Sequence, residues 1–235
     1  MTTKKLYAAL LGFTCSVVPS LAGATSDTIS LDRGWLFKLG EGASPAITVQ
    51  KAQAEGWRTV NVPHDFQIEQ PWVAPAADER SDNSDAGANI KSRLSSRGFK
   101  EMGGGWYVKT VTPDAAKKGK RALLDFQGIM YYGDVYLNGE RVGGTDYGYV
   151  GFEIDVTNKL KYGQENTVAV YANTGEPKQS RWYTGGGLFR DVSLIYTDAQ
   201  LYFLRHPLYI TTTDNKTVHI TANVQCHTKQ NTVAM

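Results

Sequence analysis

The sequence predicts an all-β protein built around a jelly-roll-like β-sandwich, and three observations point to that class. After residue 24, no segment of any length repeats apolar residues at the helical period. Short runs rich in β-branched and aromatic residues recur instead, separated by Gly, Asn, Asp and Pro. Asn138-Gly139 lies between two such runs and is a strong hairpin signal, because both turn positions favour positive φ. Many short antiparallel strands imply two packed sheets.

Ten runs are predicted strands, namely residues 35–39, 59–62, 106–112, 121–126, 134–137, 152–156, 167–171, 192–196, 208–213 and 217–224. In the run 121–126 the apolar residues Ala122, Leu124 and Phe126 fall on one face, and the run 152–156 alternates in the same way. Because side chains alternate along a strand, we expect one dry face and one wet face on each. Residues 52–56 are expected to form a single helical turn.

The N-terminus has the pattern of a secretory signal. Lys4 and Lys5 supply the positive region, residues 6–18 form a short apolar run, and the small residues 22–24 fit a cleavage site. We expect residues 1–24 to be a cleaved signal peptide and the mature chain to be secreted or periplasmic. An uncleaved anchor is the alternative, although the run is short for a membrane span.

Removal of the signal takes the net charge from +2 to 0, because Lys4 and Lys5 leave and no acid does. A neutral chain has no global attraction for nucleic acid or an anionic membrane, so neither is an expected partner. Cys15 leaves as well, and Cys226 remains as a single thiol without a disulfide partner. We expect no metal and no cofactor, because no metal-ligand spacing relates the four histidines at positions 64, 206, 219 and 227.

Residues 71–97 differ from the rest of the chain, since they are rich in Asp, Ser, Asn and Ala and poor in large apolar groups. A segment of this composition buries too little surface to order itself. Long loops inside compact domains are usually functional or mobile, and a disordered insertion is the alternative.

The most informative stretch is residues 180–192, Ser-Arg-Trp-Tyr-Thr-Gly-Gly-Gly-Leu-Phe-Arg-Asp-Val. Three glycines permit a tight turn or a close backbone approach. The aromatic and guanidinium groups beside them suit sugars, because aromatic rings stack on C–H groups and arginine donates to hydroxyls. The other interpretation is a bulged hairpin with a packed aromatic corner.

This stretch resembles the arginine-tryptophan-tyrosine, glycine, aromatic-arginine signature of the sugar-binding domain of glycoside hydrolase family 2, which includes bacterial β-galactosidases and β-glucuronidases. Other motifs match in the family's order: residues 62–66 (Val-Pro-His-Asp-Phe), 105–109 (Gly-Trp-Tyr-Val-Lys), 126–128 (Phe-Gln-Gly), 135–139 (Val-Tyr-Leu-Asn-Gly) and 142–143 (Val-Gly). The resemblance covers about residues 30–200. It implies a galactose-binding-domain-like sandwich over 27–203 and the start of an immunoglobulin-like sandwich over 204–235, with a boundary near Pro207.

The resemblance also implies the chemistry. The family's two catalytic glutamates belong to a β/α barrel with no counterpart among these residues, so we transfer no catalytic residue and expect this chain alone to be inactive.

The candidate substrate-binding residues are Arg181, as a donor to sugar hydroxyls or to a barrel carboxylate, and Trp182, which either stacks on sugar or fills the sheet edge. Asp65 and His64 are also candidate substrate-binding residues, and the favoured alternative is a structural role in which they bond to each other and brace a strand end. Arg190 is expected to hold backbone carbonyls. The sodium site of some β-galactosidases is doubtful, because Ser180 and Arg181 stand where an aspartate contributes to it.

These inferences favour the N-terminal, non-catalytic portion of an exported glycosidase that hydrolyses O-glycosidic bonds in carbohydrate metabolism, with a β-glycoside substrate and a barrel domain as partner. A stand-alone carbohydrate-binding module and a non-functional truncated product are the alternatives. The stretch 226–235 has no strand pattern and departs from the family, which favours a truncation or frameshift there.

Overall fold

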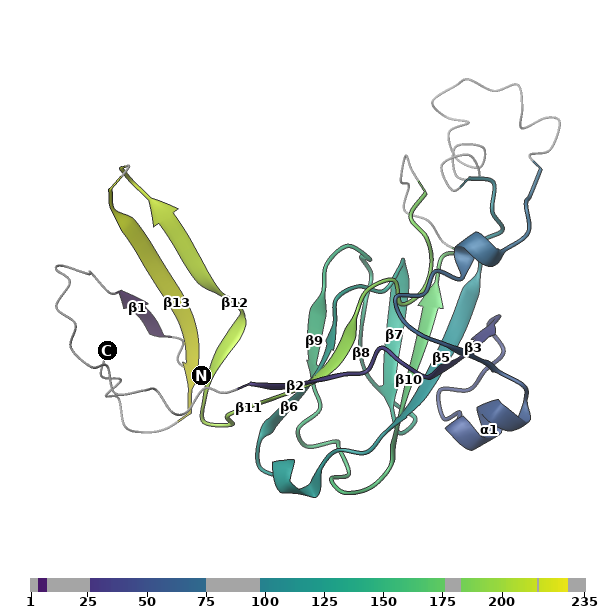
Figure 1. Cartoon of the computed structure of the whole chain (residues 1–235), viewed down its shortest axis with the longest axis horizontal. Coiled ribbons are helices and arrows are strands. Elements are labelled where there is room, and N and C mark those ends of the chain that lie inside the picture. Colours follow the sequence, from purple (N-terminus) through teal and green to yellow (C-terminus); the bar gives the residue numbers. More distant parts are fainter. Residues whose placement is uncertain (1–3, 8–25, 75–97, 176–182, 215, 228–235) are drawn as a thin grey trace.

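A computed structural model describes the backbone of residues 4–7 and all atoms of residues 26–74, 98–175, 183–214 and 216–227. The strands form three antiparallel sheets (Figure 1). The six-stranded sheet has the order β4 (Arg58–Val60), β3 (Trp35–Leu39), β5 (Gly104–Val111), β10 (Asn166–Asn173), β7 (Tyr132–Leu137), β8 (Glu140–Thr145). The four-stranded sheet has the order β2 (Asp27–Ser30), β11 (Val192–Thr197), β6 (Arg121–Phe126), β9 (Phe152–Asp155). The three-stranded sheet has the order β1 (Lys4–Tyr7), β13 (Val218–Cys226), β12 (Leu201–Thr212).

The predicted all-β sandwich is confirmed, and each predicted run overlaps a strand. The hairpin turn is also confirmed, because Asn138 has φ +52° and Gly139 has φ +88° between β7 and β8. Strands β1, β2 and β8 are not among the ten predicted runs, and the four residues of β2 are all exposed at a sheet edge and show no apolar alternation. The helix α1 spans Val49–Ala54, so it begins before the expected turn, where the Thr48 side chain caps it by accepting from the Lys51 backbone N–H at 3.2 Å.

The core lies between the six-stranded and four-stranded sheets. The six-stranded sheet contributes the buried residues Trp35, Phe37, Tyr107, Val135, Leu137, Val168 and Val170, and the four-stranded sheet contributes Ala122, Leu124, Phe126, Ile154, Val192, Leu194 and Tyr196. The predicted dry faces of residues 121–126 and 152–156 are therefore confirmed. Each fully buried side chain of this size stabilises the fold by about 1.5–3 kcal/mol through transfer from water.

Helix α1 covers part of the outer face of the six-stranded sheet (Figure 1). Its Ala52 packs in a second apolar cluster with Trp57, Trp106, Val108 and Ala169. The half of the outer face that lies over β7 and β8 is not covered by this helix.

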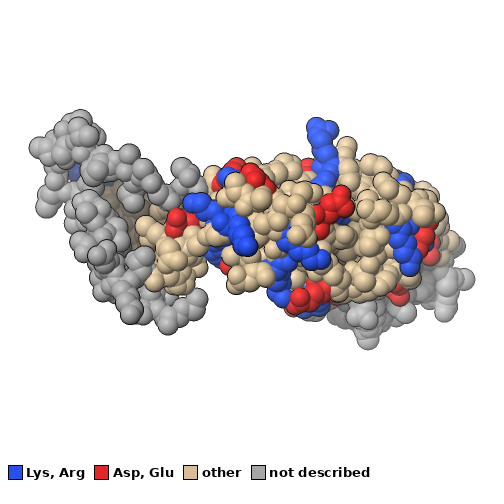
Figure 2. All heavy atoms as spheres, turned by 90° about the horizontal axis from the view of Figure 1, so that it is seen from below, with Lys and Arg blue, Asp and Glu red and all other residues tan. Residues whose placement is uncertain are grey.

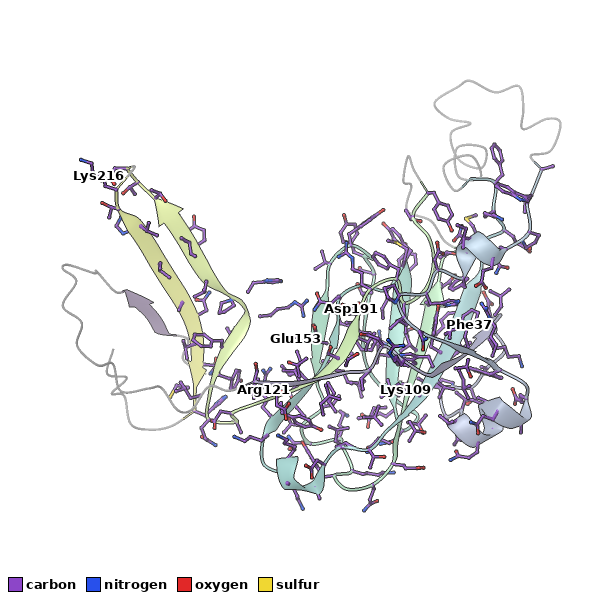
Figure 3. All side chains as sticks on the ribbon, viewed as in Figure 1. Phe37, Lys109, Arg121, Glu153, Asp191 and Lys216 are labelled. Carbon is purple, nitrogen blue, oxygen red and sulfur yellow. The ribbon has the colours of Figure 1, made fainter. Side chains whose placement is uncertain are left out.

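The predicted wet face of β6 is wrong, because Leu123 and Asp125 are buried as well. The first residues of β12 cover this face. Arg205 pairs with Asp125, lies 3.7 Å from Glu153 and donates to the Gln127 side chain at 3.4 Å. Glu153, which was expected to be solvated, thus lies beside a cation of the three-stranded sheet. Figure 3 shows Glu153 on the side of the sandwich that faces β12.

The three-stranded sheet stands apart from the sandwich (Figure 1). Its strands β12 and β13 pair with a register shift between Phe203 and Leu208, where His206 has φ +51°. The chain therefore bends at the expected boundary but stays within one strand. Strand β1, at the start of the predicted signal peptide, pairs with residues 221–224 of β13. In the parts of the chain described, no helix is long and apolar enough to cross a membrane.

Candidate functional site

The glycine-rich signature lies at one end of the sandwich, between two other segments of chain. His64 and Phe66 donate their backbone N–H groups to the carbonyls of Leu188 and Gly186, at 2.7 and 2.9 Å. On the other side, Met130 and Gly187 exchange two backbone hydrogen bonds, at 2.7 and 2.8 Å. Three segments far apart in sequence thus meet here and fix the backbone of residues 186–188.

Two of the three glycines are required by both conformation and space. Gly185 has φ +75° and Gly187 has φ +114°, values that L side chains rarely adopt. A Cβ at Gly187 would lie 2.2 Å from the Tyr107 hydroxyl, and one at Gly185 would lie 2.9 Å from an Asp65 carboxylate oxygen. The predicted close backbone approach is therefore observed. The groups that approach the two glycines are the Tyr107 hydroxyl and the Asp65 carboxylate.

Asp65 ties the signature to the strand end. Its Oδ1 accepts from the backbone N–H groups of Gly186, at 2.8 Å, and Gln67, at 3.0 Å. Its Oδ2 accepts from the Tyr183 hydroxyl at 2.8 Å. Asp65 thus fixes the first described residue after the segment that carries Arg181 and Trp182.

His64 bonds to partners other than Asp65, so the expected His64–Asp65 hydrogen bond is wrong. The His64 Nδ1 lies 2.7 Å from the Tyr107 hydroxyl, and Nε2 lies 3.1 Å from an Arg58 guanidinium nitrogen. Because a guanidinium only donates, Nε2 is the acceptor and Nδ1 carries the proton. Glu69 completes the cluster through its ion pair with Arg58. His64 does brace the strand end, as expected, but it does so through its hydrogen bond with Tyr107.

Burial favours the neutral forms of His64 and Tyr107. It lowers the pKa of His64, with the nearby Arg58 acting in the same direction and Glu69 opposing. Burial also raises the pKa of Tyr107, against an opposing hydrogen bond with the Leu188 backbone. A neutral imidazole and a neutral phenol joined by a hydrogen bond fit a structural brace.

Arg190 donates to the backbone carbonyls of Gln127 and Tyr149, at 3.4 and 3.3 Å, and its guanidinium lies 4.9 Å from the Phe189 ring. The prediction that Arg190 holds carbonyls is confirmed. Arg190 is exposed, however, so water can replace it at both acceptors.

Arg181 and Trp182 lie outside the described residues, and their predicted contacts with sugar remain predictions. The same holds for residues 75–97 of the predicted long loop. Among the residues that are described, no group of three or more His, Cys, Asp and Glu side chains lies together as a metal site would.

Sequence reasoning missed Tyr107 and Gln67. Tyr107 stands in a matched motif, but only the fold brings it under Gly187. Gln67 is fully buried, and neither its amide oxygen nor its amide nitrogen has a hydrogen-bond partner. A glutamine in a polar stretch after a proline gives no signal of burial, so no sequence pattern could have found it.

The fold and this loop define the class of protein: a galactose-binding-like β-sandwich with a clamped glycine loop at one end. The family model described as "Glycosyl hydrolase 2 galactose-binding domain-like" matches residues 101–230. The chain belongs to glycosyl hydrolase family 2, and it is homologous to the N-terminal region of those enzymes.

Individual relatives agree with this assignment. The chain is 34% identical over 164 residues to a β-galactosidase, BoGH2A, of Bacteroides ovatus, an alignment that covers 69% of this chain and 17% of that protein. It is 35% identical over 115 residues to a β-glucuronidase of Bacteroides fragilis, covering 47% of this chain and 16% of the relative. The aligned residues therefore span about one sixth of the length of these enzymes.

Solved structures show the same fold. A β-glycosidase from Bacteroides vulgatus superposes with a TM-score of 0.70 at 27% identity, over 87% of this chain and 25% of that one. A family 2 member from Bacteroides cellulosilyticus gives a TM-score of 0.64 at 30% identity, over 84% of this chain and 25% of that one. These alignments extend beyond the sandwich, since they cover more of the chain than residues 27–203 contain.

Proposed function

We propose that these residues are the N-terminal sugar-binding portion of an exported glycosidase that hydrolyses O-glycosidic bonds. The observation that carries the proposal is the clamped signature loop. The Asp65 side chain and the backbones of His64, Phe66 and Met130 fix residues 183–188 at one end of the sandwich. A loop held in this way can form part of a binding wall, and the proposal assigns Arg181 and Trp182 to that wall.

In this proposal Arg181 donates to hydroxyls of a β-glycoside, and Trp182 stacks on a sugar ring. The acid and the nucleophile of a retaining glycosidase are two carboxyl groups about 5 Å apart. We assign neither to these residues, and the proposal gives both to a barrel domain. The chain by itself should therefore bind sugar and hydrolyse none. The relatives' names include both a β-galactosidase and a β-glucuronidase. The proposal therefore names the substrate class, the β-glycosides, and not one particular sugar.

The proposal is tested in a hybrid enzyme in which this chain replaces the matching N-terminal region of the Bacteroides ovatus β-galactosidase. Arg181→Ala should lower kcat/KM about tenfold, roughly the value of one charge-assisted hydrogen bond made in the transition state. The melting temperature should stay near that of the unmodified hybrid. Arg33→Ala, which removes an exposed arginine on another loop, is the matched control and should change neither quantity. Unchanged activity of the Arg181 variant, or its unfolding, would favour the packed-corner interpretation.

A further inference from the structure

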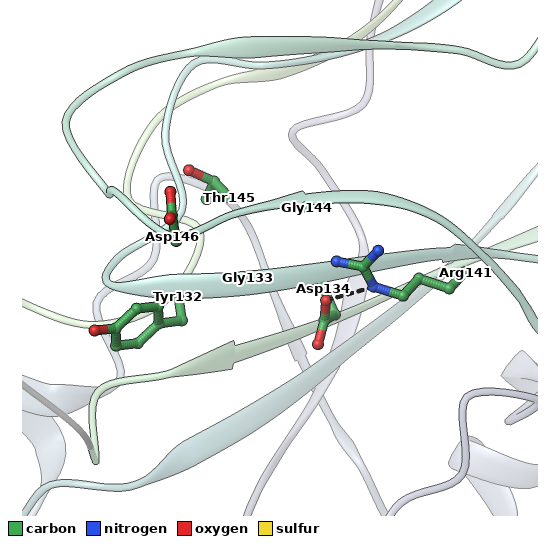
Figure 4. Close-up of a pocket in the computed structure, with 7 residues that line it drawn as sticks. All are labelled: Tyr132, Gly133, Asp134, Arg141, Gly144, Thr145 and Asp146. Atoms are coloured by element: carbon green, nitrogen blue, oxygen red, sulfur yellow. Dashed lines mark hydrogen bonds and ion pairs between the residues drawn. The ribbon is translucent and has the colours of Figure 1, made fainter.

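A hollow on the outer face of the sandwich lies over strands β7 and β8, on the half of the sheet that α1 leaves bare (Figure 4). Its volume is about 460 Å³. Sites for small molecules usually enclose roughly 300–1,000 Å³. The lining combines one aromatic ring, one hydroxyl, two carboxylates, one guanidinium and two glycines: Tyr132, Thr145, Asp134, Asp146, Arg141, Gly133 and Gly144.

The alternation of β7 explains why polar groups gather here. Gly133, Val135 and Leu137 are buried toward the core, so Tyr132 and Asp134 project from the opposite face. Gly133 packs toward the core, whereas Gly144 faces the hollow, because a Cβ there would also lie 3.2 Å from an Arg141 guanidinium nitrogen and 3.3 Å from Asp134 Oδ1. A Cβ at Gly144 would lie 2.2 Å from the Gly133 carbonyl oxygen, and one at Gly133 would lie 2.7 Å from Ile129. Without side chains at these two positions, the two strands stay closely paired and the surface above them remains open.

The polar groups are arranged as a set of donors and acceptors. The Arg141 Nε donates to Asp134 Oδ1 at 2.7 Å, and this bond leaves the terminal guanidinium nitrogens and Asp134 Oδ2 available to a ligand. Figure 4 shows Asp146 and Thr145 at the end of β8, across the hollow from this pair. Both members of the pair are partly exposed, at 60% for the Arg141 side chain and 41% for Asp134. A ligand in the hollow would therefore reach them without any rearrangement of the fold.

Charge decides which ligand the hollow favours. Arg141 and Asp134 neutralise each other, and Asp146 adds one negative charge. A uronate or sulfate would meet this net negative lining, and like charges close together repel. A neutral ligand rich in hydroxyls can instead donate to the carboxylates and accept from Arg141, and hydrogen bonds to charged groups are the stronger kind. The lining also includes the aromatic ring of Tyr132, and the electron-rich face of such a ring suits the C–H groups of a sugar.

We propose that this hollow is a second sugar-binding site, which takes one neutral hexose unit of a β-linked glycan. Tyr132 stacks on the sugar ring, Asp134 and Asp146 accept from its hydroxyls, and Arg141 donates to one of them. None of the described residues that line this hollow belongs to the signature loop. The site would hold a glycan chain at the sandwich while another part of that chain is processed elsewhere.

The test is a titration of the full chain with lactose, a neutral β-linked disaccharide, followed by two-dimensional NMR of the ¹⁵N-labelled protein. Resonances of residues 132–134 and 141–146 should shift and saturate. Tyr132→Ala and Asp134→Ala should each weaken binding at least about fivefold, whereas Tyr132→Phe, which keeps the ring, should bind nearly as well as the unmodified chain. Glucuronate should produce no saturable shift of these resonances.

Asp155→Ala is the matched control, because Asp155 forms a similar exposed ion pair with Arg121 at 3.0 Å on the other sheet. It should leave lactose binding unchanged. The proposal is overturned if no resonance near the hollow shifts up to the solubility limit of lactose, or if Asp155→Ala weakens binding as much as Asp134→Ala. Binding that Arg181→Ala abolishes and Asp134→Ala spares would also overturn it, and would support the proposed role of the signature loop.

Discussion

The sandwich and the β12–β13 hairpin differ in how much of their apolar surface is covered, although both are built from alternating strands. In the sandwich, Leu124 is 1% exposed between two sheets, whereas Leu208 of the hairpin is 54% exposed. Tyr209, Ile210, Val218 and Ile220 are also exposed in the hairpin. The difference teaches that alternation makes a strand, and that only a second layer turns its apolar face into a core.

The largest expected effect contrasts one leucine from each region. Leu124→Ala should lower the free energy of unfolding by about 2–5 kcal/mol, because it removes buried methyl groups and leaves a cavity. Leu208→Ala should change it by less than about 0.5 kcal/mol, as an exposed substitution does. Urea denaturation of the two variants measures both values. A loss at Leu208 as large as that at Leu124 would mean that another layer covers the hairpin.

The second effect concerns the junction between the two regions. Arg205→Ala should lower the free energy of unfolding by about 1–3 kcal/mol, because Asp125, only 5% exposed, loses its cation. The Arg121 guanidinium lies 4.1 Å from the Tyr202 ring and supports the same junction, and Figure 3 shows Arg121 on this side of the sandwich.

Thermal denaturation gives the Arg205 effect, and hydrogen exchange shows where protection is lost. Faster exchange should be confined to β6, β9 and the start of β12. Lys216→Ala removes a cation at the far tip of the hairpin (Figure 3) and should have no effect on either measurement. Loss of protection throughout the sandwich, and not at the junction alone, would contradict the localised role of this contact.

A smaller effect is expected at Arg190. Its two carbonyl acceptors are reached by water, so Arg190→Ala should cost about 1 kcal/mol or less, the net value of an ordinary hydrogen bond. The shift in melting temperature measures this, with Arg33→Ala as a control that lacks such acceptors. A loss comparable with that of Leu124→Ala would place Arg190 in the core rather than at its rim.

The smallest effect is a pH dependence that comes from His64. Its pKa in the folded chain lies below the ordinary value of 6.5, so the unfolded chain binds more protons between the two values. The stability contribution is complete above about pH 6.5 and is lost as the pH falls toward the folded-state pKa. Urea denaturation across this range should show that slope, and His64→Gln should flatten it. Asp155 and Asp198, whose pKa values are lowered, act at more acidic pH and leave this window unaffected.

The surface offers a further contrast with nucleic-acid-binding sandwiches. Lysine and arginine side chains are interspersed with aspartate and glutamate over the face seen in Figure 2. Mixed charges agree with the nearly neutral composition and give that face no single-sign field.

The sequence by itself determined most of the strands, the sandwich class and the hairpin at Asn138-Gly139. Those features follow from local rules: side-chain alternation, turn residues with positive φ, and the absence of a helical period. It also indicated that the glycines of the signature allow a close approach, since only glycine adopts φ values such as that of Gly187 without strain.

Only the tertiary structure decided what the approaching groups are and which faces are covered. His64 and Asp65 are neighbours in sequence, and the sequence suggested that they bond to each other. In the fold they bond to Tyr107 and Gly186, which lie 43 and 121 residues away along the chain. The outer face of β6 was expected to be wet, and Arg205 covers it from another sheet. Such pairings depend on how distant strands are placed in space, and alternation within one strand carries no information about that placement.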